Sequence, residues 1–189
     1  AAHVIGYVNG DGDGVYGIEK AFDEVVHSNP MSLLQYGPMQ GDARLAELTL
    51  ERLVKTHKMN PDGQGLIISN GAGQLLGLVP ITVLEPGDEV YMDEFTFTSA
   101  INSIRNMGGK ALGIKTDEHG MIPSELEKAA QSGKGKYIYL IPNFQNPTGI
   151  TMPLERRKEI YAIASKYDLF IYEDDPYGEI RFAGEYIPT

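Results

Sequence analysis

The sequence predicts an α/β protein built on a mostly parallel, doubly wound sheet. Short apolar segments of strand length alternate with longer, helix-like segments from about residue 42 to the end of the chain. Short apolar strands of this kind are typical of a sheet that is covered on both faces. Turns rich in glycine, proline, asparagine and aspartate separate the segments. The alternation favours parallel strands that are connected by helices.

The first 41 residues are expected to form a separate N-terminal segment. Residues 9–14 are rich in glycine and aspartate and predict a loop, and residues 18–27 predict a short helix. The loop has the Asp-x-Asp-Gly spacing of a calcium loop, starting at Asp11. An EF-hand needs glutamate at its twelfth position, where this chain has Phe22. Calcium binding is therefore not expected.

Residues 42–189 are expected to carry the alternating helices and strands. The predicted helices cover residues 42–57, 74–84, 98–107, 124–131 and 153–167. The predicted strands cover residues 66–69, 89–93, 110–115, 137–142 and 169–172. Leu45 and Leu48 help to define one apolar face of the first of these helices. Ser124 and Glu127 have the spacing of a capping box, and Pro153 suits the first turn of the last helix.

Composition and charge exclude several classes of protein. The 189 residues are enough for one domain with a hydrophobic core, and the apolar fraction of 42% is typical of a globular protein. The formal charge is −10 and no basic stripe is present, so a nucleic-acid partner is not expected. The chain has no cysteine, which excludes disulfides and thiolate chemistry.

No segment predicts a secretion signal or a membrane anchor. Residues 1–10 lack a basic start and a long apolar core. The most apolar region, residues 66–84, is interrupted by Asn70, Pro80 and several glycines, which is not typical of a membrane span. We therefore expect a cytoplasmic protein that has no membrane partner.

Two polar motifs each follow a predicted strand. Asn-Pro-Thr-Gly occupies residues 146–149, and Asp-Asp-Pro-Tyr occupies residues 174–177. The carboxyl ends of parallel strands meet at one crevice, so the side chains of Asn146, Asp174 and Tyr177 should converge there. A carboxylate can keep a ring nitrogen protonated, while an amide and a phenol can bind a ring hydroxyl. The set suits a flat, electron-poor, hydroxylated heterocycle.

A glycine-rich turn lies between the predicted strand at 66–69 and the helix that follows it. The sequence of the turn is Ser69-Asn70-Gly71-Ala72-Gly73-Gln74. Small residues let backbone N–H groups approach an anion, and the N-terminus of a helix favours negative charge. The turn is not a P-loop, because no Lys-Ser or Lys-Thr pair follows it. Tight packing of strand against helix explains such a turn equally well.

Together these motifs resemble the pyridoxal 5'-phosphate (PLP) aminotransferases of fold type I, in the class I and II group. The resemblance extends from about Tyr36 to Phe182. It implies PLP as the cofactor and the first, incomplete part of the PLP-binding large domain for residues 42–189. For residues 1–41 it implies a segment of the small domain and the dimer arm. It also implies a homodimer whose active sites are shared between the subunits.

The resemblance assigns a role to each candidate residue. The cofactor phosphate would be bound by Gly71, Ala72, Gly73 and Gln74, and by Tyr36 from the neighbouring subunit. Phe97 would stack on the pyridine ring, Asn146 and Tyr177 would bind the ring oxygen, and Asp174 would pair with the ring nitrogen. Asp174 and Tyr177 are also the candidate catalytic residues. The family often has a hydroxyl or amide side chain where Ala72 and Gly73 stand, so backbone groups would bind more of the phosphate here.

Several of these residues could also have a purely structural role. Phe97 could belong to the core, Tyr177 could be a half-buried aromatic residue, and Tyr36 could be exposed in a turn. Asp175 is the second choice for the ring nitrogen, and together with Asp174 it could bind a divalent metal. No third ligand is evident and the four histidines lack metal-binding spacing, so no metal is expected.

In the family, a lysine that follows the Asp174 position forms the Schiff base with PLP. Its expected position lies beyond the last residue of this sequence. The chain ends at Thr189, and its last lysine, Lys166, precedes Asp174. The family's later phosphate-binding and carboxylate-binding arginines are not found either. We therefore expect the sequence to be the first part of a longer protein, since Schiff-base catalysis needs that nucleophile.

The resemblance implies a transaminase that moves an amino group between an amino acid and a 2-oxo acid. The sequences at residues 142–149 and 173–177 resemble the subgroup that acts on 2-aminoadipate, aromatic or aliphatic amino acids. The alternatives are another fold-type I PLP enzyme, such as a lyase or decarboxylase, and the aminotransferase-like domain of a transcription regulator. The ring-binding residues are common to the fold-type I enzymes, since the cofactor supplies the chemistry.

Overall fold

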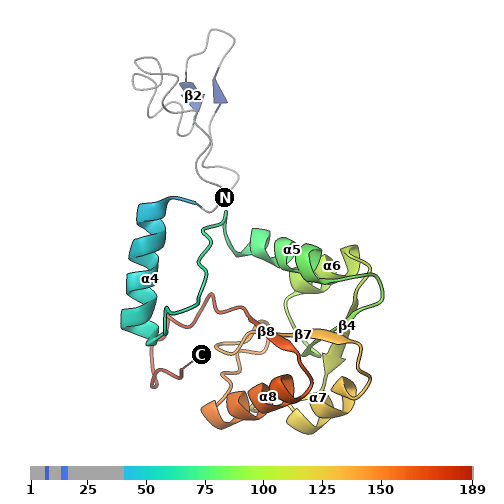
Figure 1. Ribbon diagram of the computed structural model, residues 1–189. Helices are drawn as coiled ribbons and strands as arrows, with labels where there is room; N and C mark the ends of the chain where they lie inside the picture. Colours follow the sequence, from blue (N-terminus) through green and yellow to red (C-terminus); the bar gives the residue numbers. More distant parts are fainter. Residues whose placement is uncertain (1–6, 9–13, 17–40, 189) are drawn as a thin grey trace.

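The computed structural model describes residues 7–8, 14–16 and 41–188 (Figure 1). The helix expected at residues 18–27, the loop at 9–13 and Tyr36 lie outside the described residues. Two short strands at the N-terminal end, β1 (Tyr7–Val8) and β2 (Gly14–Tyr16), pair antiparallel.

A four-stranded parallel sheet forms the centre of the structure. Its strands lie in the order β4 (Lys110–Ile114), β3 (Glu89–Asp93), β7 (Gly135–Leu140) and β8 (Phe170–Glu173). All three pairings are parallel. The strand order departs from the chain order because β4 pairs on one side of β3 and β7 on the other. The strand predicted at residues 89–93 agrees with β3 residue for residue.

Helices cover both faces of this sheet, as the alternation of side chains along each strand requires. On β3, Val90 and Met92 pack in the cluster that contains α5 (Ala72–Val83) and α6 (Thr98–Asn106). Tyr91 points to the other face, in the cluster that contains α7 (Pro123–Ala130) and α8 (Leu154–Lys166). Figure 1 shows these two helix pairs on opposite sides of the strands. The predicted α/β fold with a parallel sheet is therefore confirmed.

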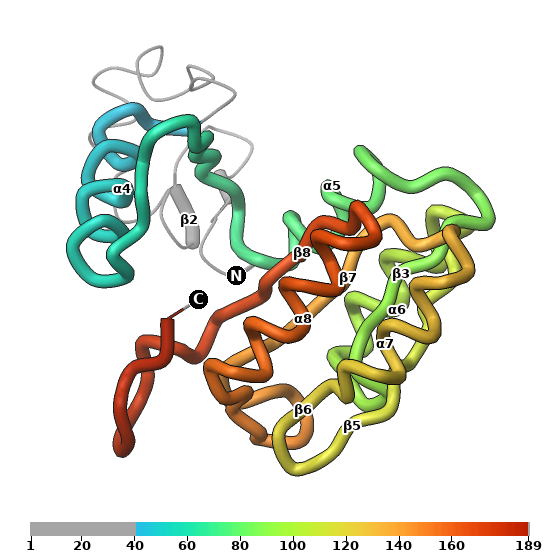
Figure 2. Tube along the Cα trace, turned by 60° about the horizontal axis from the view of Figure 1, so that its bottom comes forward, coloured from blue at the N-terminus to red at the C-terminus, as the bar shows by residue number. Residues whose placement is uncertain are grey.

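The helix predicted at residues 42–57 is confirmed as α4 (Ala43–His57). It lies apart from the sheet (Figure 2). The carboxylate of Asp42 caps it by accepting from the backbone N–H of Leu45 at 2.8 Å. The C-terminal end of this helix contacts the last described segment of the chain. Arg52 pairs with Glu179, and the two ring nitrogens of His57 lie 3.0 Å from Glu179 and from the hydroxyl of Tyr186.

Three details differ from the sequence-based expectation. Residues 66–69 form no strand, because this segment pairs with no other strand within the described residues. The capping box at Ser124 is wrong, since α7 begins at Pro123 and its N-cap is Ile122, without a side-chain cap. The fixed φ of proline starts the helix one residue early and places Ser124 inside the first turn.

The third difference is a small hairpin that was not predicted. Strands β5 (Thr116–Asp117) and β6 (Gly120–Met121) pair antiparallel around a turn in which Gly120 has φ of +94°. Arg156 of α8 holds the hairpin, because its guanidinium donates to the Asp117 carboxylate and to the carbonyls of Gly120 and Met121. A contact between such distant segments leaves no local sequence pattern.

Among the described residues, no helix combines the length and apolar character needed to cross a bilayer. The same part of the chain contains no group of three or more histidine, aspartate or glutamate residues arranged to hold a metal ion.

Candidate functional site

A cavity of about 280 Å³ opens at the carboxyl ends of the parallel strands. Its lining comes from the first turns of α5 and α6, from the loop after β7 and from the segment after β8. The lining residues are Ala72, Gly73, Leu76, Phe97, Ser99, Ile141, Asn146, Asp174, Pro176 and Tyr177. Six of the nine predicted site residues are therefore brought together in one place: Ala72, Gly73, Phe97, Asn146, Asp174 and Tyr177.

Asp174 is held at the edge of the sheet by two contacts. Its backbone N–H donates to the carbonyl of Leu140 at 2.8 Å, which extends the pairing of β7 with β8. Its Oδ2 accepts a 2.7 Å hydrogen bond from the hydroxyl of Tyr139. Burial, together with the Asp174 carboxylate, raises the pKa of the Tyr139 hydroxyl above its ordinary value. Tyr139 therefore stays protonated and is a constant donor to Asp174.

Asp175 faces a different part of the structure and does not line the cavity. Its Oδ2 accepts from the side-chain amide of Asn143 at 3.0 Å, and its Oδ1 accepts from the backbone N–H of Gly178 at 2.9 Å. The two neighbouring carboxylates thus point to different partners. Of this pair, Asp174 is the one available to a ligand in the cavity, and the arrangement does not favour a metal held jointly by Asp174 and Asp175.

The loop that carries Asn146 is organised by the buried side chain of Gln145. Its amide nitrogen donates to the carbonyl of Phe95 at 2.6 Å. Its amide oxygen accepts from the backbone N–H and the hydroxyl of Thr148, at 2.9 and 2.7 Å. The peptide bond between Asn146 and Pro147 is cis. These contacts present the side chain of Asn146 to the same cavity as Tyr177.

The glycine-rich turn forms the start of α5, with Gly71 as the N-cap at φ of +84°. Gly73 has no heavy atom within 4 Å of the position that a Cβ would take, so the space beside it is open. Gly71 and Gln74 adjoin the cavity without lining it, and the side chain of Gln74 accepts from the backbone N–H of Asn70 at 2.7 Å. Backbone N–H groups at a helix N-terminus, next to open space, suit an anionic group.

The sequence left open whether Phe97 belongs to the ligand site or to the core, and the structure shows a contact with each. Phe97 lines the cavity and also packs against the cluster under α5 and α6. Phe97 is the N-cap of α6, directly before the first turn that also contributes Ser99 to the lining. Ser99, in the first turn of α6, lines the same cavity and was not predicted.

The residues that support the site were also missed by the sequence-based prediction. Tyr139 was assigned only to the predicted strand at residues 137–142. Asn143 and Gln145 were noted only as part of residues 142–149, without a role of their own. Their one sequence signal is that polar side chains capable of hydrogen bonding stand in or beside a strongly apolar strand. Both amide residues are almost fully buried, at 1% exposure for Asn143 and 4% for Gln145.

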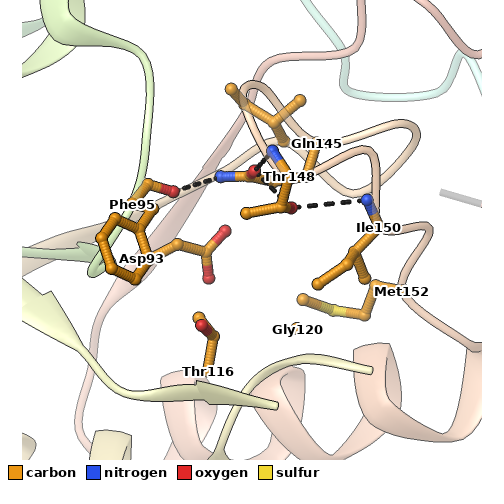
Figure 3. Close-up of a pocket in the computed structure, with 9 residues that line it drawn as sticks. Asp93, Phe95, Thr116, Gly120, Gln145, Thr148, Ile150 and Met152 are labelled. Carbon is orange, nitrogen blue, oxygen red and sulfur yellow. Dashed lines mark hydrogen bonds between the residues drawn. The ribbon is translucent and has the colours of Figure 1, made fainter. Parts of the chain in front are cut away.

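A second, much smaller cavity of about 10 Å³ lies beside the loop of Gln145 (Figure 3). Asp93, the last residue of β3, points into it and is only 4% exposed. Within the described residues, its Oδ1 has no hydrogen-bond partner. Burial raises the pKa of Asp93 to about 6, although the neighbouring Gln145 lowers it in part.

The lining of the larger cavity therefore offers a carboxylate, an amide, a phenol, an aromatic face and a helix N-terminus. These groups fit a flat heteroaromatic ring that has a protonated nitrogen, a ring hydroxyl and an anionic substituent. The partner of a ring nitrogen must be a fixed anion, and the bond from Tyr139 fixes Asp174 in that position.

Residues 13–188 match the protein family described as aminotransferase class I and II. The aromatic-amino-acid aminotransferase 1 of Thermococcus litoralis is 32% identical over 167 residues, which cover 86% of this chain and 40% of that relative. The mitochondrial kynurenine/alpha-aminoadipate aminotransferase of Mus musculus is 33% identical over 174 residues, with 82% of this chain and 41% of that relative covered.

A solved structure shows the same arrangement of the fold. The crystal structure of Pyrococcus horikoshii kynurenine aminotransferase, in complex with PMP and with KYN and KYA, superposes with a TM-score of 0.78 at 33% identity. The match covers 86% of this chain and 41% of that structure. The chain thus spans about two fifths of the length of the relatives it matches. The chain belongs to the class I and II aminotransferase family, as its motifs predicted.

Proposed function

We propose that the protein is a PLP-dependent transaminase, which moves an amino group between an amino acid and a 2-oxo acid. The observation that carries the proposal is the convergence of Asp174, Asn146, Tyr177 and Phe97 on one cavity beside the start of α5. Family membership and the named activities of the relatives support it. Residues 42–189 are then the first part of the PLP-binding domain.

Each lining residue has a distinct part in holding the cofactor. Asp174 keeps a proton on the ring nitrogen, and Asn146 and Tyr177 bind the ring oxygen. When bound, PLP supplies an electron-poor ring that accepts the electron pair left by a broken substrate Cα–H bond. The carboxylate of Asp174 stabilises the positive ring nitrogen on which this property depends.

The phosphate end and the ring face are held by other groups. The backbone N–H groups of Ala72 and Gly73 bind the phosphate at the start of α5, with Gly71 and Gln74 shaping the turn. Phe97 stacks on the ring, as its place in the lining allows. The role of Tyr36 at the phosphate of a neighbouring subunit rests on the family resemblance.

The proposed substrates are amino acids of the aromatic, 2-aminoadipate or aliphatic type. The relatives named for aromatic amino acids, kynurenine and alpha-aminoadipate support this choice. A structure named for alpha-aminoadipate aminotransferase, from Thermus thermophilus, matches with a TM-score of 0.73 at 28% identity. The cytoplasmic location stays a prediction, which fractionation of cells would test.

A homodimer is part of the proposal. Helix α5, whose first turn lines the cavity, exposes two large apolar side chains: Leu78 is 43% exposed and Ile81 is 61% exposed. A second subunit that covers these side chains would pack on the helix whose first turn lines the phosphate end of the site. Light scattering on the purified full-length protein should give twice the mass of one chain, and the mass of a single chain would contradict this part.

Reconstitution with PLP tests the function directly. The purified full-length protein should turn yellow with PLP, and borohydride should reduce the chromophore irreversibly. With 2-oxoglutarate as acceptor, an aromatic amino acid or 2-aminoadipate should yield its 2-oxo acid and glutamate in equal amounts. Release of carbon dioxide or ammonia without glutamate would indicate a decarboxylase or lyase instead. Absence of any PLP-dependent spectrum would contradict the proposal as a whole.

Replacing Phe97 with alanine should weaken PLP binding about tenfold, because an aromatic contact on the ring face is lost. The midpoint of thermal unfolding of the apo protein should change far less than that of a core variant. Phe95→Ala is the matched control, since Phe95 is 60% exposed and does not line the larger cavity. Equal PLP affinity in Phe97→Ala and in the control would leave Phe97 as a packing residue only.

A further inference from the structure

We propose that Asn143 is a positioning residue that joins the two loops on either side of the cavity and so fixes Asn146 relative to Tyr177. The inference rests on the proposed function, in which both of these residues bind the ring oxygen. Asn146 and Tyr177 come from different loops, and neither loop alone sets the separation of the two side chains.

Asn143 is 1% exposed, and both the nitrogen and the oxygen of its side-chain amide form hydrogen bonds. Its Nδ2 donates to Oδ2 of Asp175 at 3.0 Å. Its Oδ1 accepts from Arg157 at 2.8 Å and from Arg181 at 3.3 Å. The amide dipole is therefore aligned between two cations and one anion, which makes these hydrogen bonds charge-assisted and strong.

The loop on the Asn146 side is closed at its base. The backbone N–H of Met152 donates to the carbonyl of Pro142 at 2.8 Å. From α8, Arg157 donates to the same two residues, through Nε to the carbonyl of Met152 at 3.0 Å and through Nη2 to the carbonyl of Pro142 at 3.2 Å. Asn143 thus extends from a rigid base, three residues before Asn146.

The segment on the Tyr177 side is a tight turn that Asp175 closes. Oδ1 of Asp175 accepts from the backbone N–H of Gly178 at 2.9 Å, with Tyr177 enclosed between them. A Cβ on Gly178 would lie 2.2 Å from Oδ2 of Asp175, so a larger residue at this position would displace the carboxylate. The remaining acceptor, Oδ2, is bound by Asn143. The amide is therefore the link between the turn of Tyr177 and the loop of Asn146.

Breaking this link should impair recognition of the ring oxygen in particular. If Asn143 acts through Asn146 and Tyr177, its loss matters only for a ligand that has the ring hydroxyl. A residue that merely stabilises the fold would affect every ligand of the cavity to the same extent. The affinities for two ligands that differ in this one group separate these cases.

The experiment compares pyridoxamine 5'-phosphate with its analogue that lacks the ring hydroxyl, by calorimetric titration of the full-length apo protein. Asn143→Ala should weaken binding of pyridoxamine phosphate about tenfold, since the charge-assisted hydrogen bond to Asp175 that joins the two loops is lost, and change binding of the analogue by less than about twofold. Asn146→Ala gives the direct effect for comparison. Asn102→Ala, an exposed asparagine on α6, is the matched control and should leave both affinities unchanged.

Asp175→Asn tests the same link from the other side and keeps the size of the residue. Gly178 and Asn143 donate to different oxygens of Asp175, and asparagine replaces one of these oxygens with an NH₂ group. One of the two contacts is then lost, and the same ligand-selective loss is expected. Equal losses for both ligands, or none, in Asn143→Ala and Asp175→Asn would overturn the inference while the proposed function stands. Failure of the unsubstituted protein to bind either ligand would instead refute the proposed function.

Discussion

Replacing Asp174 with alanine is expected to lower the turnover of the full-length enzyme by at least about 10²–10³-fold, as when one preorganised electrostatic group is removed. The carboxylate lines the cavity and is fixed by the hydroxyl of Tyr139 at 2.7 Å. Without it, nothing at the end of β8 keeps the ring nitrogen protonated. The effect should fall mainly on turnover, because the phosphate end and the ring face keep their contacts.

Two further variants test whether the effect comes from the charge at this position. Asp174→Asn keeps the shape of the side chain, and it should lose most of the activity as well. Asp168→Asn removes an exposed carboxylate at the opposite end of the same strand, where asparagine tolerates the positive φ of 54°. This control should keep normal turnover. Near-normal turnover in Asp174→Ala would refute the assignment of Asp174 to the ring nitrogen.

The choice between Asp174 and Asp175 shows how far the sequence alone could reach. The sequence predicts that both carboxylates lie at the carboxyl end of the sheet, because the Asp-Asp-Pro-Tyr motif directly follows a predicted parallel strand. In an extended chain, successive side chains point to opposite faces. A change of register by one residue would therefore exchange the carboxylate that lines the cavity. The structure sets that register through the bond from Asp174 N–H to the carbonyl of Leu140.

Other parts of the site depend on contacts that are distant in the sequence. Tyr139 is separated from Asp174 by 35 residues and Asn143 from Asp175 by 32, so no local pattern connects either pair. The strand expected at residues 66–69 was wrong for a related reason. An apolar segment becomes a strand only when a neighbouring strand is present to pair with it. The hydrophobic periodicity of the segment contains no information about that partner.

Replacing Asp93 with asparagine is expected to stabilise the folded protein above pH 6. Asp93 is 4% exposed, and within the described residues its Oδ1 has no hydrogen-bond partner. A charged carboxylate is costly in such a place, and burial accordingly raises its pKa to about 6, with a further contribution from Glu94. Asparagine has nearly the same shape and carries no charge.

The direction of the pH dependence follows from proton binding. An unfolded chain releases the Asp93 proton near pH 4, while the folded protein keeps it until about pH 6. The folded state therefore binds more protons between these values, and its stability falls as the pH rises from about 4 to about 6. The rise of the Asp93 pKa from its ordinary value to about 6 corresponds to a loss on the order of 3 kcal/mol in the free energy of unfolding.

Urea unfolding at a series of pH values would measure this loss. Asp93→Asn should lack this fall in stability between pH 4 and 6, and should exceed the unsubstituted protein by up to about 3 kcal/mol at pH 8. Asp62→Asn, at an exposed turn, should retain the fall. If the stability of Asp93→Asn fell by the same amount between pH 4 and 6, the pH dependence would come from other groups than Asp93. The expected gain implies that β3 ends in a destabilising residue beside the loop of Gln145, and proteins keep such residues mainly near functional sites.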